Sequence, residues 1–327
     1  MSLDGLSDAR GPAVLAEGLA KSYGSHRGLV DLDLEVHRGE VVGVIGPNGA
    51  GKSTTIRLLL DLLRPTAGRV QVLGQEPRSG GAGLRRRIGY LAGDLVLPER
   101  MTGRAVVDLM LRLSGRGGDA AARARAEQIA ERLGLDLDRQ SRTLSTGNRQ
   151  KIGLVQAFAH APELLVLDEP TSGLDPLVQQ TFHALVREAT AEGATVLMSS
   201  HIISEVEQTA QRVAVLRDGR LVALAPVEEL RARSLRQVAV EVTGTATVAQ
   251  VAADLGLDQP VGEHPLHGGT RVRGSFPGDP VELVGRLGAA GWREQVLDLV
   301  VEAPDLQDAV LRFYVADVTA TDEEVLA

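Results

Sequence analysis

The sequence predicts an α/β fold with a parallel sheet and a helical insertion, followed by a small α+β domain. Short runs of β-branched residues alternate with amphipathic helical patterns over about the first 230 residues. The charge balance also changes along the chain. Residues 1–233 carry 29 basic and 28 acidic side chains, whereas residues 234–327 carry 6 and 15. A length of 327 residues, at ~150 residues per domain, agrees with two domains.

The first predicted strand is Val41–Ile45, a continuous apolar run of the kind found in parallel strands that are buried on both faces. A helix is expected directly after Ser53. Apolar side chains recur there with spacings of three and four residues, at Ile56, Leu59, Leu60 and Leu63. Pro65 and Gly68 are expected to end this helix.

The elements that follow complete the first domain. Residues 101–160 are expected to be mostly helical, with one helix at Ala120–Leu133. Two further buried strands are predicted at Leu164–Leu167 and Thr195–Met198, with a helix at Pro176–Ala191 between them. Strands that alternate with helices favour a parallel sheet, and the helical stretch predicts a subdomain at about residues 95–160.

The C-terminal region has the predicted order β-α-β-β-α-β followed by a helix, which is typical of a ferredoxin-like α+β sandwich. The segments behind this prediction are a strand at Gln237–Thr243, a helix at Thr247–Leu255, one arm of a hairpin at Thr270–Gly274, a helix at Val281–Leu287, a strand at Val296–Glu302 and a closing helix at Leu306–Tyr314. We therefore expect domains at residues 13–233 and 234–315, with a flexible N-terminus at residues 1–12 and a tail at residues 316–327.

Composition excludes several classes of protein. Hydrophobic residues make up 43% of the chain and charged residues 24%, as in ordinary soluble globular proteins. The absence of cysteine excludes disulfides and thiolate zinc sites, and a net charge of −8 argues against a nucleic-acid partner. No apolar run approaches the ~18 residues of a membrane span, and no secretory signal is recognisable. The chain is expected to be cytoplasmic, or held at a membrane by a partner.

Between the first strand and its helix, the sequence matches the phosphate-loop pattern G-x-x-x-x-G-K-[ST] at Gly46, Pro47, Asn48, Gly49, Ala50, Gly51, Lys52 and Ser53. Glycines let backbone N–H groups converge on phosphate oxygens, and the helix N-terminus adds the positive end of its dipole. We expect Lys52 to contact the β- and γ-phosphates, Ser53 to ligate Mg²⁺, and Thr54 to complete the nucleotide site. The chain has only three lysines, which argues against the alternative of a glycine-rich turn without function.

Two carboxylates, Asp168 and Glu169, end the predicted strand that begins at Leu164. At the carboxyl end of a strand beside a phosphate loop, Asp168 is expected to hold Mg²⁺ through water. Glu169 is expected to polarise the attacking water as a general base. The alternative is a pair of acidic residues that cap a helix before Pro170.

These motifs follow the order found in the nucleotide-binding subunit of ATP-binding-cassette (ABC) transporters, which residues 13–225 resemble. Leu144–Asn148, with the sequence LSTGN, resembles the signature motif of that family. Ser172–Asp175 resembles its D-loop, and Ser199–His201 resembles the segment that carries its switch histidine. Tyr23 matches the aromatic residue that stacks on adenine. The resemblance implies a P-loop ATPase that uses ATP and Mg²⁺.

The resemblance also implies roles for single residues. The implied catalytic residues are Lys52, Glu169 and His201. The residues implied to act across a dimer interface, on ATP held by the partner chain, are Ser145, Thr146, Gly147 and Asp175. Simpler alternatives remain open: serine and aspartate are common helix N-caps, a histidine at a strand end can be structural, and a tyrosine can be a surface aromatic.

The sequence departs from the family pattern at two places. Gly93 and Asp94 stand where the family has the Q-loop glutamine, so either Asp94 replaces that metal contact or the coordination is incomplete. The signature also ends in Asn148 and not in glutamine. Both departures resemble bacterial exporters of the ABC-2 type, which are related to drug and antibiotic efflux ATPases.

The resemblance implies an ATPase subunit that dimerises on ATP, with a second copy or a related subunit, and drives export through a separately encoded membrane permease. It would lie at the cytoplasmic face of the membrane, and its cargo would be a drug, an antibiotic or another hydrophobic compound. The C-terminal domain resembles one appended to many such ATPases and is expected to aid dimerisation or regulation. The alternatives are an importer ATPase and a soluble ABC ATPase that acts on ribosomes or DNA.

Overall fold

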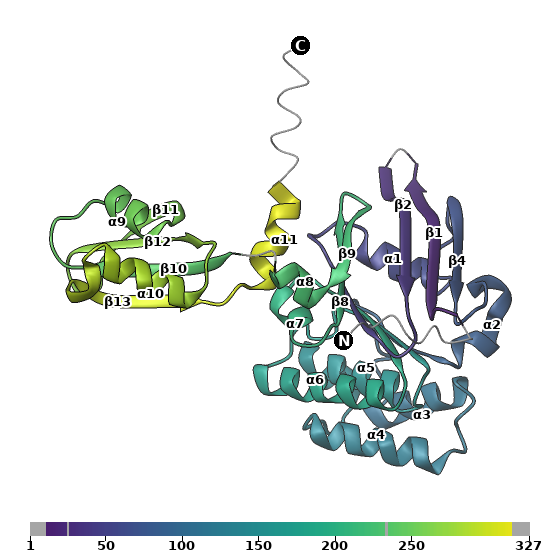
Figure 1. Ribbon diagram of the computed structural model, residues 1–327. Helices are drawn as coiled ribbons and strands as arrows, with labels where there is room; N and C mark the ends of the chain where they lie inside the picture. The colour runs from purple at the N-terminus through teal and green to yellow at the C-terminus, as the bar shows by residue number, and fades with distance from the viewer. Residues whose placement is uncertain (1–10, 25, 233–234, 316–327) are drawn as a thin grey trace. The chain divides into compact units, whose positions relative to one another are not determined.

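The computed structural model describes residues 11–24, 26–232 and 235–315 (Figure 1). The chain forms two compact units, Met1–Val227 and Glu228–Ala327. The sequence prediction placed this boundary after residue 233. The difference lies in α8 (Val227–Ala232), whose Arg231 Nε donates a 3.5 Å hydrogen bond to the carbonyl oxygen of Pro304 in the second unit. Apart from residues 11 and 12, the predicted flexible ends lie outside the described residues.

The first unit is built on a six-stranded sheet with the order β5-β6-β7-β3-β8-β9. In that order the strands are Ile88–Leu91, Leu164–Asp168, Thr195–Ser200, Val41–Ile45, Arg212–Arg217 and Arg220–Pro226. Neighbours are parallel from β5 to β8, and β9 pairs with β8 in the antiparallel sense. The predicted parallel sheet is therefore confirmed, with the carboxyl ends of β3, β6 and β7 at one edge.

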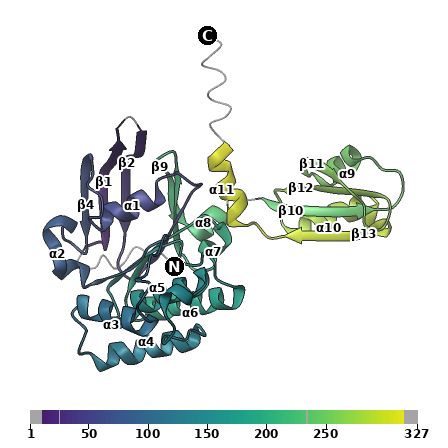
Figure 2. The same ribbon diagram turned by 180° about the vertical axis from the view of Figure 1, so that it is seen from behind.

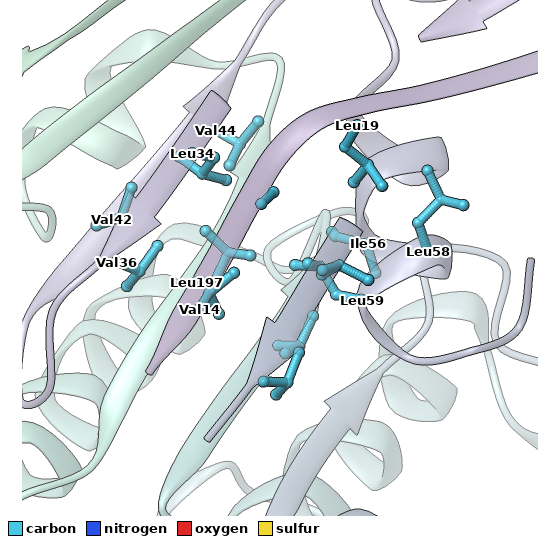
Figure 3. Close-up of a cluster of buried hydrophobic side chains, with 14 of the residues drawn as sticks. Val14, Leu19, Leu34, Val36, Val42, Val44, Ile56, Leu58, Leu59 and Leu197 are labelled. Atoms are coloured by element: carbon cyan, nitrogen blue, oxygen red, sulfur yellow. The ribbon is translucent and has the colours of Figure 1, made fainter. Parts of the chain in front are cut away.

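A second, antiparallel sheet with the order β2-β1-β4 completes the unit, and its strands are His26–Val36, Val14–Tyr23 and Ala67–Val72. Figure 3 shows side chains of β1, β2, β3, β7 and α1 (Lys52–Leu59) meeting in one buried hydrophobic cluster. Val44 of β3, Leu34 of β2 and Ile56 of α1 are each at most 2% exposed. Because β3 and α1 are both packed into this cluster, the turn between them is held in place.

Helix α1 is shorter than the apolar spacing predicts, since it ends at Leu59 and not near Leu63. Asp61 adopts a left-handed conformation with φ of +56°, which stops the helical hydrogen bonding. Leu60 and Leu63 nevertheless pack against the hydrophobic cluster from the irregular segment that follows. Their spacing reflects burial, and the expectation that they continue the helix was wrong.

The remaining helices of the first unit are α2 (Pro77–Arg85), α3 (Gly103–Leu113), α4 (Ala120–Arg132), α5 (Thr146–Phe158), α6 (Pro176–Ala191) and α7 (Ile203–Glu207). α3, α4 and α5 occupy the segment for which helices were expected, and they lie together on one side of the unit in both views (Figure 1, Figure 2). Arg104 of α3 joins them to the rest of this subdomain through ion pairs with Glu127 of α4 and Asp138. The subdomain thereby holds α5 beside the sheet.

The second unit has an antiparallel sheet with the order β11-β12-β10-β13. Its elements in chain order are β10 (Arg236–Val242), α9 (Val248–Leu255), β11 (Asp258–Glu263), β12 (Thr270–Phe276), α10 (Pro280–Ala289), β13 (Val296–Glu302) and α11 (Leu306–Val315). This order and the β-α-β-β-α-β sequence agree with the predicted ferredoxin-like topology. Among the described residues, no helix has the length and apolar character needed to cross a bilayer.

Candidate functional site

The phosphate loop lies between the end of β3 and the start of α1. Gly51 is the N-cap of α1, with φ of +107°, and no side chain caps the helix. Gly49 has φ of +85°, and a Cβ there would meet nothing within 4 Å. Glycine is therefore favoured at this position by the backbone conformation and not by a lack of space. The uncapped N–H groups of the first helical turn are free to bind an anion such as a phosphate.

Lys52 is held inside this loop, with only 6% of its surface exposed. Its Nζ donates a 2.7 Å hydrogen bond to the carbonyl oxygen of Gly46 and lies 3.6 Å from Oε1 of Glu169. A Cβ on Gly46 would lie 2.5 Å from the carbonyl oxygen of Leu216, so only glycine fits there. The ammonium is therefore fixed at the loop and directed towards the acidic end of β6.

Asp168 and Ser53 bring two hard oxygen donors together. The Ser53 hydroxyl donates to Oδ1 of Asp168 at 3.2 Å, and the Ser199 hydroxyl donates to the same oxygen at 2.6 Å. Asp168 of β6 and Ser199 of β7 are register partners in the parallel sheet, which places their side chains side by side. Asp168 is 3% exposed, so its orientation is set by these two hydroxyls.

Glu169 follows in a left-handed conformation, with φ of +50°. Such a conformation in a residue other than glycine costs about 1–3 kcal/mol and needs support from its surroundings. The Glu169 N–H donates to Oγ of Ser199 at 3.0 Å, and its carbonyl oxygen accepts from Nε2 of Gln150 at 3.0 Å. Its Oε2 lies 2.7 Å from Nδ1 of His201. Hydrogen bonds therefore fix both the backbone and the side chain of Glu169.

Tyr23 at the end of β1 also lines the site, with 44% of its surface exposed. Its ring covers Gly28, because a Cβ at Gly28 would lie 2.6 Å from Cε2 of Tyr23. The Lys21 ammonium lies 5.4 Å from the ring centroid. An exposed π-face beside a phosphate loop is suited to stack on a nucleobase.

These residues line one cleft of about 440 Å³. Of the predicted site residues, the structure brings together Tyr23, Pro47, Asn48, Gly49, Gly51, Lys52, Ser53, Thr54, Asp94, Asp168, Glu169 and His201. Ala50 is buried in the hydrophobic cluster instead, and Gly46 contributes its carbonyl oxygen to Lys52. Gly28, Arg57 and Ser172 also line the cleft, although the sequence analysis gave them no contact role. Arg57 stands four residues after Ser53 on α1, so helical spacing was a usable signal.

The signature segment does not line this cleft. Ser145 caps α5 by accepting a 3.3 Å hydrogen bond from the N–H of Asn148, and Asp175 caps α6 by accepting from Val178 at 3.0 Å. A Cβ on Gly147 would lie 2.6 Å from the carbonyl oxygen of Gly173, so the signature turn touches the segment after Glu169. Both serine and aspartate therefore have the capping role that their residue types suggested.

Comparison with known proteins agrees with this geometry. Residues 29–172 match the ABC transporter family. The daunorubicin resistance ATP-binding protein DrrA3 of Streptomyces coeruleorubidus is 41% identical over 224 residues, which are 68% of this chain and 71% of that protein. The chain belongs to the ABC transporter family of ATP-binding proteins. The resemblance inferred from its motifs is therefore confirmed.

Two further relatives of this ABC ATPase support the assignment. The bacitracin transport ATP-binding protein BcrA of Bacillus licheniformis is 33% identical over 66% of this chain and 70% of that protein. A solved ATP-binding subunit of an ABC transporter is 31% identical, with a TM-score of 0.63, and the match covers 67% of this chain and 92% of that one. The chain is an ATPase, and ATP is its substrate.

The segment after β5 departs from the family pattern at the Asp168 side of the ABC ATPase cleft. A Cβ on Gly93 would lie 3.4 Å from Oδ2 of Asp168, so this backbone runs directly beside the carboxylate. Asp94 follows with an exposed side chain that lines the cleft. The described residues contain no group of three or more His, Cys, Asp or Glu side chains arranged for a metal. Mg²⁺ commonly binds through one or two protein oxygens together with substrate phosphates and water, and Ser53 with Asp168 fits that donor set.

Proposed function

We propose that this ABC ATPase dimerises around ATP and drives export of a drug-like or antibiotic compound through a separate membrane permease. The observation that carries the proposal is the position of Ser145–Gly147. The side chains of Ser145 and Thr146 are exposed, and none of the three residues lines the cleft of its own chain. A second copy or a related subunit would bring this helix N-terminus, with its free N–H groups, onto the γ-phosphate of ATP in the facing cleft.

Within the cleft the chain supplies each part of phosphoryl transfer. Lys52 and the loop N–H groups hold the β- and γ-phosphates, and Tyr23 stacks on the adenine. Ser53 and Asp168, with Asp94 as a third candidate, would hold Mg²⁺, which supplies charge neutralisation at the phosphates when bound. Glu169 accepts the proton of the attacking water at its carboxylate.

His201 holds that carboxylate in place from the end of β7. Its Nδ1 lies 2.7 Å from Oε2 of Glu169, while 54% of its side-chain surface stays exposed. The remaining ring nitrogen is therefore accessible to the γ-phosphate. This arrangement uses the histidine to orient the base and to sense the nucleotide at the same time.

Export is supported by the named roles of the relatives, daunorubicin resistance and bacitracin transport. The permease would bind the helical subdomain and the segment between Gly93 and Arg104, and the whole complex would lie at the cytoplasmic face of the membrane. Val96 in that segment is 88% exposed, and Leu113 of α3 is 64% exposed. Leu109 and Met110 of the same helix are each 37% exposed, and an apolar patch of this kind would suit a contact with the permease.

Glu169→Gln tests the proposed ATPase mechanism and the dimer together. The amide keeps the shape of the side chain but cannot accept the proton, so we expect ATP binding to persist, turnover to fall by about 10²–10⁴-fold, and a closed dimer to accumulate with ATP. Sedimentation velocity and phosphate release would measure both effects. Glu163→Gln is the matched control, because Glu163 pairs with Arg87 away from the cleft. Wild-type turnover by Glu169→Gln would refute Glu169 as the base.

The permease is tested by purifying the tagged chain from detergent-solubilised membranes of its host. A stoichiometric, strongly hydrophobic multi-helix protein would support the exporter and allow its cargo to be assayed. Recovery only from the soluble fraction, alone or with ribosomes or DNA, would contradict export while leaving the ATPase intact.

We also propose that the second unit aids dimerisation or regulates the ATPase. The region from residue 234 onward carries a net charge of −9, which suits an interaction surface. Deletion from Glu228 onward is expected to weaken ATP-dependent dimerisation or to change turnover. Unchanged dimerisation and turnover in the truncated chain would remove this role.

A further inference from the structure

The signature helix α5 carries a buried glutamine that reaches the catalytic segment of the same chain. Gln150 is 5% exposed, and its Nε2 donates to the carbonyl oxygen of Glu169 at 3.0 Å and to that of Pro170 at 3.2 Å. It does not line the ATP cleft. Its amide therefore contacts the backbone of the base and not the nucleotide.

This contact falls where the backbone needs support. Glu169 has φ of +50°, and its peptide groups are held on both sides: Ser199 accepts from its N–H, and Gln150 donates to its carbonyl oxygen. If the carbonyl oxygen lost that donor, it would keep only the 3.2 Å hydrogen bond from the N–H of Ser172, three residues further along the same turn. The Glu169 backbone would then have lost its hydrogen bond to α5, and the carboxylate between Lys52 and His201 would be held less firmly.

The same helix touches the catalytic segment at a second point. Gly147, one turn before Gln150, approaches Gly173 so closely that a Cβ would lie 2.6 Å from the Gly173 carbonyl oxygen. α5 and the segment from Glu169 to Gly173 are thus joined at both ends. The N-terminal part of α5 therefore contacts the segment that carries Glu169 through Gln150 as well as through this backbone approach.

We propose that Gln150 is a positioning residue that ties the signature helix of each chain to the Glu169 of the same chain. The inference rests on the proposed function, in which that helix binds ATP in the facing cleft of a second chain. Engagement of the partner's ATP then reaches the base of the neighbouring site through two hydrogen bonds. Gln150 would link the two ATP sites without contacting either nucleotide.

The first test compares two glutamines of one helix. Gln150→Met keeps the length of the side chain and removes the donor, and we expect kcat to fall about tenfold, equivalent to about 1.4 kcal/mol, with the Kd for ATP within twofold. Gln156→Met is the control, because Gln156 also lies on α5 and its Oε1 accepts no hydrogen bond from any described residue. Gln150→Leu, which also removes the donor and adds no buried charge, replaces the methionine variant if that one fails to fold. Equal kcat in the Gln150 and Gln156 variants, or a parallel loss of ATP affinity, would overturn the inference.

Mixed dimers separate an effect on the same chain from an effect on the partner. The first mixed dimer pairs a Glu169→Gln chain with a Gln150→Met chain, so that the only intact base belongs to the Gln150→Met chain. The reference dimer pairs a Glu169→Gln chain with a wild-type chain. Single-turnover cleavage of ATP is expected to be about tenfold slower in the first dimer than in the reference dimer. In a dimer of a Glu169→Gln, Gln150→Met chain with wild type, cleavage is expected within twofold of that reference. The reverse order, or equal rates, would overturn the inference. If tandem tags recover no mixed dimer with ATP, the proposed dimer fails, whereas the comparison of Gln150 with Gln156 still decides the role of Gln150.

Discussion

Removal of one buried hydroxyl, in Ser199→Ala, probes how the sheet holds Asp168 and Glu169 at the cleft. Ser199 is fully buried, donates to Oδ1 of Asp168 at 2.6 Å and accepts from the N–H of Glu169 at 3.0 Å. Alanine leaves the carboxylate with the longer Ser53 contact and leaves the Glu169 N–H without this acceptor. One substitution therefore loosens both carboxylate residues of the site.

The size of the effect follows from the two hydrogen bonds lost. A bond to a charged group contributes about 1.5–3 kcal/mol, and a buried donor left unsatisfied costs about 1–3 kcal/mol, so unfolding should become easier by about 3 kcal/mol. For a unit of this size that corresponds to a melting temperature lowered by about 6–12 °C. Because Ser199 orients the carboxylate proposed to hold Mg²⁺, the Mg²⁺ concentration for half-maximal activity should rise at least about tenfold.

Ser200→Ala is the matched control on the same strand. Ser200 is equally buried and also makes two hydrogen bonds, to Oε2 of Glu205 and from the N–H of Ile202, each at 2.9 Å. Thermal unfolding and a Mg²⁺ titration of ATP hydrolysis, run on both variants, separate stability from function. We expect similar losses of stability but a shifted Mg²⁺ requirement in Ser199→Ala alone. The reasoning fails if both variants shift the Mg²⁺ requirement equally, or if neither does.

Three further predictions follow from single contacts. Gly93→Gln places an amide beside Asp168, because a Cβ at this position would lie at an ordinary 3.4 Å from the carboxylate. In a Mg²⁺ titration of ATP hydrolysis, the variant should reach half-maximal activity at a severalfold lower Mg²⁺ concentration. An unchanged Mg²⁺ requirement would show that residue 93 does not affect Mg²⁺ binding. Gly147→Ala puts a Cβ 2.6 Å from the backbone oxygen of Gly173. Steady-state assays should show turnover lowered at least about tenfold, with the Kd for ATP retained. Turnover at the wild-type rate would contradict the close packing of the signature turn against Gly173. Burial lowers the pKa of His160 from the ordinary 6.5, so as the pH falls below 6.5 the unfolded chain takes up a proton that the folded chain does not, and stability is lost. Urea unfolding at pH 7.5 and 5.5 should show that the free energy of unfolding falls less between these two pH values in His160→Gln than in the wild type. The same fall in both proteins would rule out this contribution of His160.

The local elements were the most predictable part of this fold. The strand Val41–Ile45 and the helix Pro176–Ala191 have the bounds in the structure that the sequence pattern indicated, since apolar runs and helical spacing act over a few residues. The end of α1 was predicted wrongly. Leu60 and Leu63 keep the helical spacing, but they reach the core from a segment that turns at Asp61. Burial of an apolar side chain does not by itself specify the backbone that presents it.

The catalytic motifs were also recognisable in the sequence, because phosphate binding depends on glycines, a lysine and a serine at short fixed spacing. The residues that hold the catalytic side chains in position were not recognisable in the sequence. Gln150 lies 19 residues from Glu169, and Ser199 lies 31 residues from Asp168. Each of these residues has a type and a local pattern that serve equally well as ordinary helix or strand positions.

The phosphate loop, the two adjacent carboxylates and the ABC signature could be read from the amino-acid sequence, because each depends on residues close together in the chain. The distances between these motifs depend on the tertiary structure. The parallel register of β6 and β7 sets Asp168 beside Ser199, and the packing of α5 brings Gln150 to the carbonyl oxygen of Glu169. The reason is physical: a local motif specifies which groups are present, whereas strand pairing and helix packing determine the distances and burial on which their chemistry depends.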